Sequence, residues 1–249
     1  MTPKKSSRGG KHRALWALGV LLILALLAAS LYVLRIRLHH NSSEIVDNDY
    51  ELVGIDVSSH NGKINFERVS RAGIDFVIIK ASEGAAFRDS RFATNYDSSK
   101  DNGLAVGAYH FFRFDVDGTL QARNFVETIG DRDFDLPLVI DVEEHGNPYV
   151  FLRSKVVRQL RDMVDELTAL EYRVMIYTNK DGYRKYMHEH FPHLPLWLCA
   201  FTHPKKLKES YTYVIQQFSH WGSVDGIEGE VDLNIFCGDS TAWQRWLHE

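Results

Sequence analysis

Cysteine is scarce in this chain, which has only Cys199 and Cys237 among its 249 residues. Two cysteines exclude a small domain stapled by several disulfides and a zinc site with four thiolate ligands. The two thiols could pair in an oxidising compartment, but they lie on strand candidates that need not be neighbours. We therefore expect both to be small buried side chains without a disulfide.

Positive charge is also scarce in the main part of the chain. Residues 1–49 hold seven Lys and Arg against three acids, so they carry +4, and because the whole chain carries −4, residues 50–249 carry −8. Phosphate binding needs a basic face, so this acidic part excludes a nucleic-acid partner. The overall composition, 45% hydrophobic and 25% charged, is ordinary for a globular protein and excludes collagen-like and mostly disordered chains.

No charge interrupts residues 14–34, a run of 21 residues. As a helix it would measure roughly 30 Å, the thickness of a bilayer core. Five Lys or Arg and no acid precede it, which places the N-terminus in the cytoplasm under the positive-inside rule. We predict a basic cytoplasmic tail over 1–13, a single-pass transmembrane signal anchor over 14–34, a tether over 35–50 and one exported domain over 51–249. The alternative is a cleaved signal peptide, whose apolar region is usually shorter, about 7–15 residues; both alternatives export the domain.

The exported domain alternates strand and helix patterns and then continues with strands alone. Five helix patterns fall at 65–72, 90–102, 119–129, 150–170 and 181–190, and eight apolar runs are typical of strands: 52–57, 75–81, 104–112, 137–143, 173–178, 196–201, 213–219 and 231–236. Alternation implies parallel strands with crossover helices, and eight strands are the number that closes a barrel filled by side chains. We predict an α/β, TIM-like barrel with five strand-helix units and three further strands, (β/α)5(β)3, preceded by one transmembrane helix. An open parallel sheet is the alternative.

Two acids lie at the end of the fourth run. In such barrels the chemistry takes place at the carboxyl ends of the strands. Asp141 and Glu143 come directly after Leu138-Val139-Ile140. On a strand, residues i and i+2 share a face, with Cα atoms about 6.5–7 Å apart. Burial of two like charges raises one pKa, which yields the acid and the carboxylate that glycoside hydrolysis requires. The alternative is a capping Asp141 and a solvated Glu143.

Other chemical side chains lie at the same strand ends. They are polar or aromatic: Asp56, Glu83, Tyr109, Tyr177, Trp197, Gln217 and Asp232. The aromatic rings could stack on the apolar faces of sugars, or could equally fill the barrel core. His188, His190 and His193 have a spacing that could hold a metal ion, but they fall at a helix end where we expect solvated side chains. We predict neither a metal nor a cofactor.

Eight motifs occur in order along the domain: GIDVSSHNG (54–62), FVIIKASEG (76–84), GAYHFF (107–112), PLVIDVE (137–143), IYT (176–178), LWLCAF (196–201), QFS (217–219) and GEVDLNIF (229–236). Together they resemble glycoside hydrolase family 25, the Chalaropsis-type lysozymes, over about residues 52–237. The resemblance implies the barrel predicted above for residues 51–249. It also implies cleavage of the β-1,4 bond between N-acetylmuramic acid and N-acetylglucosamine in peptidoglycan.

The resemblance also assigns roles to residues. Glu143 matches the family's catalytic acid, and Asp141 matches the second carboxylate, which supports the cation or positions the substrate's acetamido group. Asp56 and Asp232 match further acids that line the family's pocket. Tyr109, Tyr177 and Trp197 match aromatic positions of its sugar groove. Whether the second step uses a covalent enzyme intermediate or substrate assistance stays open.

The resulting hypothesis is a monomeric muramidase, anchored in the plasma membrane, with its catalytic domain in the periplasm or outside the cell. Its partners are peptidoglycan glycan strands and the membrane. One alternative is a protein that binds peptidoglycan without cleaving it. The other is a barrel hydrolase of another acetamido polysaccharide, such as chitin.

Overall fold

The N-terminal unit is one long helix. The computed structural model describes residues 8–48 and 50–248, and the chain divides between Ser43 and Glu44 into two compact units. Helix α1, Arg8–Asn48, contains the stretch Leu15–Arg35, which has a mean hydropathy of 2.7 and is long and apolar enough to cross a membrane. A signal sequence near the N-terminus can meet the same criteria of length and composition. The helix continues through residues 35–48, most of the segment that the sequence analysis predicted as a tether, and no Gly or Pro interrupts it there.

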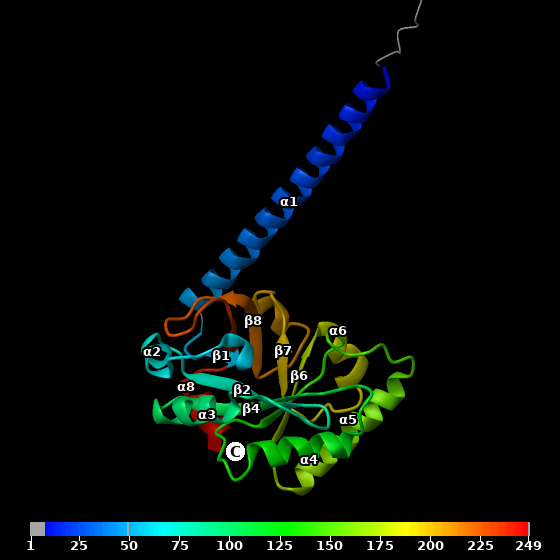
Figure 1. Cartoon of the computed structure of the whole chain (residues 1–249). Helices are drawn as coiled ribbons and strands as arrows, with labels where there is room; N and C mark the ends of the chain where they lie inside the picture. The colour runs from blue at the N-terminus through cyan, green and yellow to red at the C-terminus, as the bar shows by residue number, and fades with distance from the viewer. Residues whose placement is uncertain (1–7, 49, 249) are drawn as a thin grey trace, which may run out of the picture. The chain divides into compact units, whose positions relative to one another are not determined.

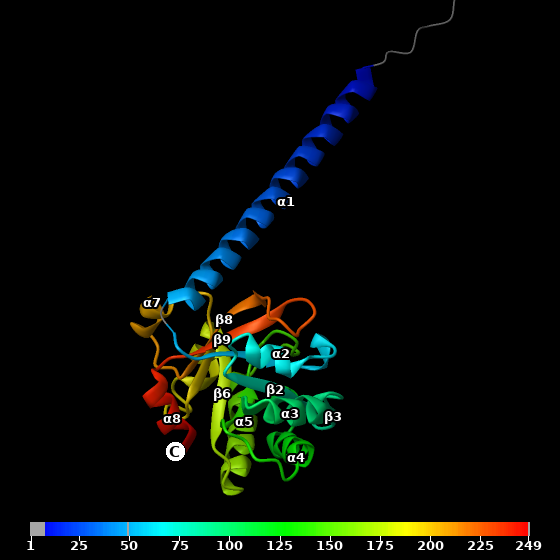
Figure 2. The same ribbon diagram turned by 90° about the vertical axis from the view of Figure 1, so that its left-hand side faces the viewer.

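The second unit is built on a closed barrel of eight strands (Figures 1 and 2). In barrel order they are β1 (Val53–Val57), β2 (Phe76–Glu83), β4 (Ala105–Phe111), β5 (Leu138–Asp141), β6 (Val174–Asn179), β7 (Leu196–Cys199), β8 (Ile215–Gly222) and β9 (Val231–Phe236). Parallel pairs link β1 through β8, and β9 closes the ring antiparallel to both β8 and β1. The (β/α)5(β)3 barrel predicted from the sequence is thereby confirmed, and the open sheet is excluded.

Helices follow the first five barrel strands and cover the outside of the barrel (Figure 2). They are α2 (Phe66–Arg71), α3 (Phe92–Asp101), α4 (Gly118–Ile129), α5 (Arg153–Ala169), and α6 (Lys180–Gly182) with its π-helical continuation η2 (Tyr183–Met187). Four short elements were not predicted: η1 (Ser59–Asn61), β3 (Phe87–Arg88), α7 (Pro204–Lys208) and the C-terminal α8 (Ser240–His248). The first three are too short for a hydrophobic period to reveal.

Alternation along the strands creates two apolar layers. Side chains such as Ile55 and Val77 point outward and pack against the helices, whereas Phe76, Ile78 and Val139 fill the barrel interior. Gly54 leaves room for this interior, since a Cβ atom there would lie 2.3 Å from the ring of Phe76.

Helix α8 covers the amino end of the barrel. Its Trp243 contacts the ring of Phe76, at the start of β2, and the ring of Phe236, at the end of the antiparallel β9, with centroid separations of 5.3 and 5.0 Å. Both rings lie at the amino end of the parallel strands, so Trp243 extends the apolar interior there. The polar side chains of the interior are left at the carboxyl end, which we call the mouth.

Candidate functional site

The mouth contains the two acids that follow β5. The strand ends at Asp141, so Glu143 lies beyond the strand rather than on it as the sequence predicted. The strand geometry nevertheless continues, because the Val142 amide donates to the Tyr177 carbonyl at 2.9 Å and the Val142 side chain is buried in the outer layer. Asp141 and Glu143, on either side of Val142, therefore both turn toward the mouth.

Burial and mutual repulsion change the acidity of this pair. Burial, followed by the charge of Glu143, raises the pKa of Asp141 well above its ordinary value, and burial also raises the pKa of Glu143. Oδ1 of Asp141 is buried and has no hydrogen-bond partner among the described residues. The pair thus retains a proton to higher pH than an isolated carboxyl, and it presents one acceptor oxygen that a ligand could satisfy.

Asp56 is held at the centre of a buried hydrogen-bond network. Its Oδ2 accepts from Gln217 Nε2 at 2.9 Å and from Asn234 Nδ2 at 2.8 Å. Gln217 in turn accepts from the Tyr177 hydroxyl at 2.7 Å, and Asn234 accepts from Trp197 Nε1 at 2.8 Å. The network fixes the orientation of Asp56, whose pKa is nevertheless raised well above its ordinary value by burial and by the charge of Asp232.

This network changes the interpretation of two aromatic candidates. Trp197 and Tyr177 are only 2% and 7% exposed, and their rings contact each other edge to face at 4.5 Å. Their polar atoms support Asp56 through Gln217 and Asn234, and the small exposed area of the two rings leaves little surface for stacking on a sugar. Tyr109 is half-buried, and its pKa is raised well above the ordinary value by burial and then by the nearby Asp56, Asp141 and Asp232.

Three ion pairs involve Asp232 and Glu83, the remaining acids of the mouth. Asp232 Oδ1 lies 2.7 Å from Nδ1 of His220; burial opposes protonation of His220, but the hydrogen bond to Asp232 raises its pKa to about 10. Glu83 Oε2 accepts from Lys80 Nζ at 2.8 Å, and Glu83 Oε1 lies 3.5 Å from Arg113 Nη1. Both acids named by the sequence are therefore paired with cations.

Lys80, Asn234 and Asn147 were missed as site residues. Lys80 is 12% exposed, and its charge lowers the pKa of both Asp141 and Glu143. Lys80 could have been found from the sequence, because it lies two residues after the inward-facing Ile78 on the same strand. Asn234 could have been found in the same way, because it lies two residues after Asp232. Asn147 donates to the carbonyl of Glu143 at 2.9 Å, a contact for which the sequence carries no signal.

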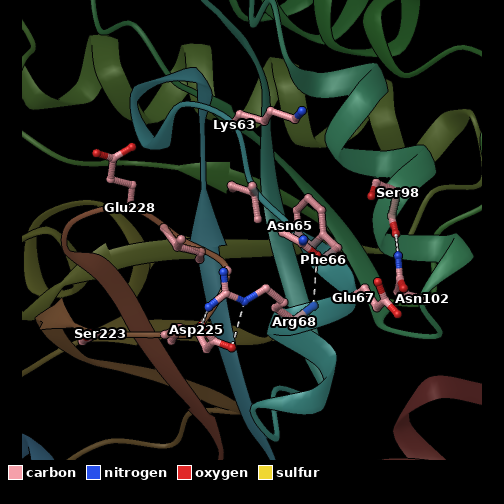
Figure 3. Close-up of a pocket in the computed structure, with 14 residues that line it drawn as sticks. Lys63, Asn65, Phe66, Glu67, Arg68, Ser98, Asn102, Ser223, Asp225 and Glu228 are labelled. Carbon is pink, nitrogen blue, oxygen red and sulfur yellow. Dashed lines mark hydrogen bonds and ion pairs between the residues drawn. The ribbon is translucent and has the colours of Figure 1, made fainter.

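The described residues contain no group of three or more His, Cys, Asp or Glu side chains placed to hold a metal ion. Cys199 and Cys237 are both free thiols. A cavity of about 770 Å³ lies outside the mouth, between α2, α3 and the loop before β9, and contains the ion pair of Arg68 with Asp225 (Figure 3). None of the acids of the mouth lines this cavity. Because the acids gather at the mouth, we take the mouth as the candidate active site.

Known proteins are similar to this chain in sequence and in structure. A family model described as glycosyl hydrolases family 25 matches residues 55–227. The uncharacterized protein YegX of Escherichia coli strain K12 is 34% identical over 203 residues, which cover 80% of this chain and 74% of YegX. Lysozyme M1 of Streptomyces globisporus is 32% identical over 202 residues, 75% of this chain and 68% of that protein. The structure of a family 25 glycosyl hydrolase from Bacillus anthracis matches with a TM-score of 0.72 and 30% identity, over 80% of this chain and 94% of that one.

Proposed function

Because the chain belongs to glycosyl hydrolase family 25, we propose that its barrel domain is a muramidase that cleaves the β-1,4 bond between N-acetylmuramic acid and N-acetylglucosamine in peptidoglycan. The observation that supports this proposal best is the buried pair of Asp141 and Glu143 at the mouth, with both pKa values raised. Glycoside hydrolysis needs one protonated and one ionised carboxyl beside the scissile bond, and a coupled pair that keeps one proton meets that need.

In this proposal Glu143 is the general acid. It is less buried than Asp141, so it can reach the leaving oxygen of a bound glycan. Asp141 is the second carboxylate: its unpartnered Oδ1 would accept a hydrogen bond from the substrate's acetamido N–H. With the shared proton on Glu143, the ionised Asp141 would stabilise the cationic transition state, and the charge of Lys80 opposes the burial that raises the pKa of Asp141.

The surrounding groups would bind the sugars. Asp56 and Asp232 supply further carboxylates, and the half-buried Tyr109 supplies a ring at the same level of the mouth. Gln217 would act through Asp56, whose carboxylate it holds. Glu83 would act through Lys80, with which it forms an ion pair.

Digestion of two insoluble polymers tests this function. The full chain, purified in detergent, is incubated with peptidoglycan and separately with chitin, and soluble products are quantified. We expect release from peptidoglycan alone. Release from chitin alone would support a hydrolase of another acetamido polymer, and sedimentation with peptidoglycan without any release would support a binding protein.

Replacement of Lys80 by Met should shift the pH dependence of activity. The ammonium group lowers the pKa of both Asp141 and Glu143, so its removal raises both. A general acid works in its protonated form, so the alkaline limb of the kcat/KM profile should move to higher pH. Measurement of kcat/KM against pH checks this, with the exposed Lys63→Met as the control. A limb that stays in place or moves to lower pH would contradict the electrostatic role of Lys80.

We also propose that helix α1 anchors the enzyme in the plasma membrane, with the N-terminus in the cytoplasm and the barrel on the wall side, where it remodels the wall. The support is the apolar stretch Leu15–Arg35 and the basic residues before it. The full-length chain should stay in the membrane fraction after alkaline washing, and protease added from the wall side should digest the barrel. A shortened, soluble mature chain would contradict anchoring, and an unchanged wall phenotype after deletion of residues 1–38 would contradict the role in remodelling.

A further inference from the structure

The loop between β5 and α5 carries two aromatic side chains in water. Tyr149 and Phe151 are 89% and 84% exposed, more than any other large hydrophobic side chain described. Val150 between them is partly buried and packs against the outer layer of the core. The contact of Val150 holds this point of the loop against the core, while both neighbours lie in solvent. Neighbouring exposed apolar side chains can form part of a binding surface.

A cavity of about 360 Å³ lies beside these two rings. We call it the loop pocket. It is formed by the β5–α5 loop, the first residue of α5, the segment after β4 and the η2 turn, and its lining comprises Phe114, Glu144, Asn147, Pro148, Tyr149, Val150, Phe151, Arg153, Lys185 and Tyr186. It therefore combines apolar rings with charged side chains, the composition of a site for an amphipathic ligand.

The charge of the loop pocket favours an anion. Glu144 is neutralised, because its carboxylate accepts from Lys185 Nζ at 2.7 Å and from the Tyr186 hydroxyl at 2.9 Å. The charge of Arg153 also lowers the pKa of Glu144, but Arg153 makes no hydrogen bond or close ion pair within residues 8–48 and 50–248. One guanidinium group with its full set of donors is thus left to bind a carboxylate.

The position of the loop pocket connects it to the proposed reaction. Glu144 lines it, and the preceding residue is Glu143, whose Cα lies only about 3.8 Å away along the chain. Glu143 turns toward the mouth, whereas the side chain of Glu144 turns toward η2. A group attached to a sugar beside Glu143 would therefore reach the loop pocket over the rim of the mouth.

We infer that the loop pocket binds the stem peptide of peptidoglycan, with a peptide carboxylate on Arg153 and an apolar peptide side chain between Tyr149 and Phe151. This inference rests on the proposed function. Muramic acid carries its short peptide on a lactyl group, and that peptide supplies both methyl side chains and free carboxylates. The loop pocket would then select glycan strands that still carry their peptides.

The test compares two substrates, one with the peptide and one in which hydrolysis has left a lactyl carboxylate in place of the peptide amide. One is a preparation of soluble glycan strands with intact stems, and the other is the same strands after an amidase has removed the peptides. Full-length Arg153→Ala and the double variant Tyr149→Ala/Phe151→Ala are assayed on both substrates. The controls are Arg158→Ala on α5 and Leu170→Ala directly after its last residue. We expect KM for peptide-bearing strands to rise at least about tenfold in both test variants. In Arg153→Ala the loss is that of a charge-assisted hydrogen bond, and in Tyr149→Ala/Phe151→Ala it is that of an apolar side chain left in water. The kcat on both substrates and the KM for stripped strands should stay at the parental values. Equal losses on the two substrates, or no loss, would overturn the inference.

A binding measurement keeps the inference testable if the parent cleaves neither substrate. Titration calorimetry compares a disaccharide-peptide with the bare disaccharide on the parental chain and on Arg153→Ala. Tighter binding of the disaccharide-peptide to the parent, lost in Arg153→Ala, supports the loop pocket even where the proposed function fails. Equal affinity for both ligands overturns it.

Discussion

Replacement of Glu143 by Gln should lower kcat by about 10³-fold, within the range of about 10²–10⁴ that a general acid contributes. Gln has nearly the same shape as Glu but has no proton to give to the leaving oxygen. Substrate binding should change little, so the KM should stay near that of the parent. Initial rates on soluble glycan strands measure both constants.

The matched control for this variant is Glu127→Gln. Glu127 is exposed on α4, where it forms an ion pair with Arg88 and contacts none of the acids of the mouth among the described residues. The control should keep the parental rate, and thermal unfolding should show that both variants are folded. A Glu143→Gln variant with a kcat near that of the parent would assign the acid to another residue.

Replacement of Asp141 by Asn should lower kcat by about 10²–10³-fold, the range observed when one group that stabilises transition-state charge is removed. Asn keeps an oxygen in the place of the unpartnered Oδ1 but has no negative charge. Asp141→Ala removes both. The kcat of the two variants, measured on the same strands, separates the two roles.

Comparable losses in Asp141→Asn and Asp141→Ala would show that charge is the main contribution. A much smaller loss in Asp141→Asn would show that the main contribution is the hydrogen bond to the acetamido group. Asp225→Asn, in the exposed ion pair with Arg68, is the control. Parental activity in Asp141→Ala would contradict any role of Asp141 in the reaction.

The barrel could be predicted because its strands have simple patterns. The run Leu138-Val139-Ile140 is apolar at every position, since one face packs against helices and the other fills the barrel. Asp141 and Glu143 were also predictable, because strand geometry extends past the end of β5 through the hydrogen bond of Val142. An acid after such a run must lie where the strands end.

Other parts of the site depend on contacts that local sequence does not encode. Trp197 satisfies the pattern of a sugar-stacking residue, but its Nε1 donates to Asn234, which lies 37 residues further along the chain, and its ring is buried. The pairing of Asp232 with His220 likewise requires the β8–β9 register. Helix α8 has an aromatic side that covers the barrel's amino end, but the sequence alone does not say what that side contacts.

The identity of the new reducing end tests the central claim most directly. Peptidoglycan is digested with the full-length chain and, in parallel, with Glu143→Gln, and the soluble products are reduced with borohydride and analysed by mass spectrometry. A muramidase with Glu143 as its acid yields products that end in muramitol, from the parent alone. Products that end in glucosaminitol, or muramitol products from both proteins at equal rates, would contradict it.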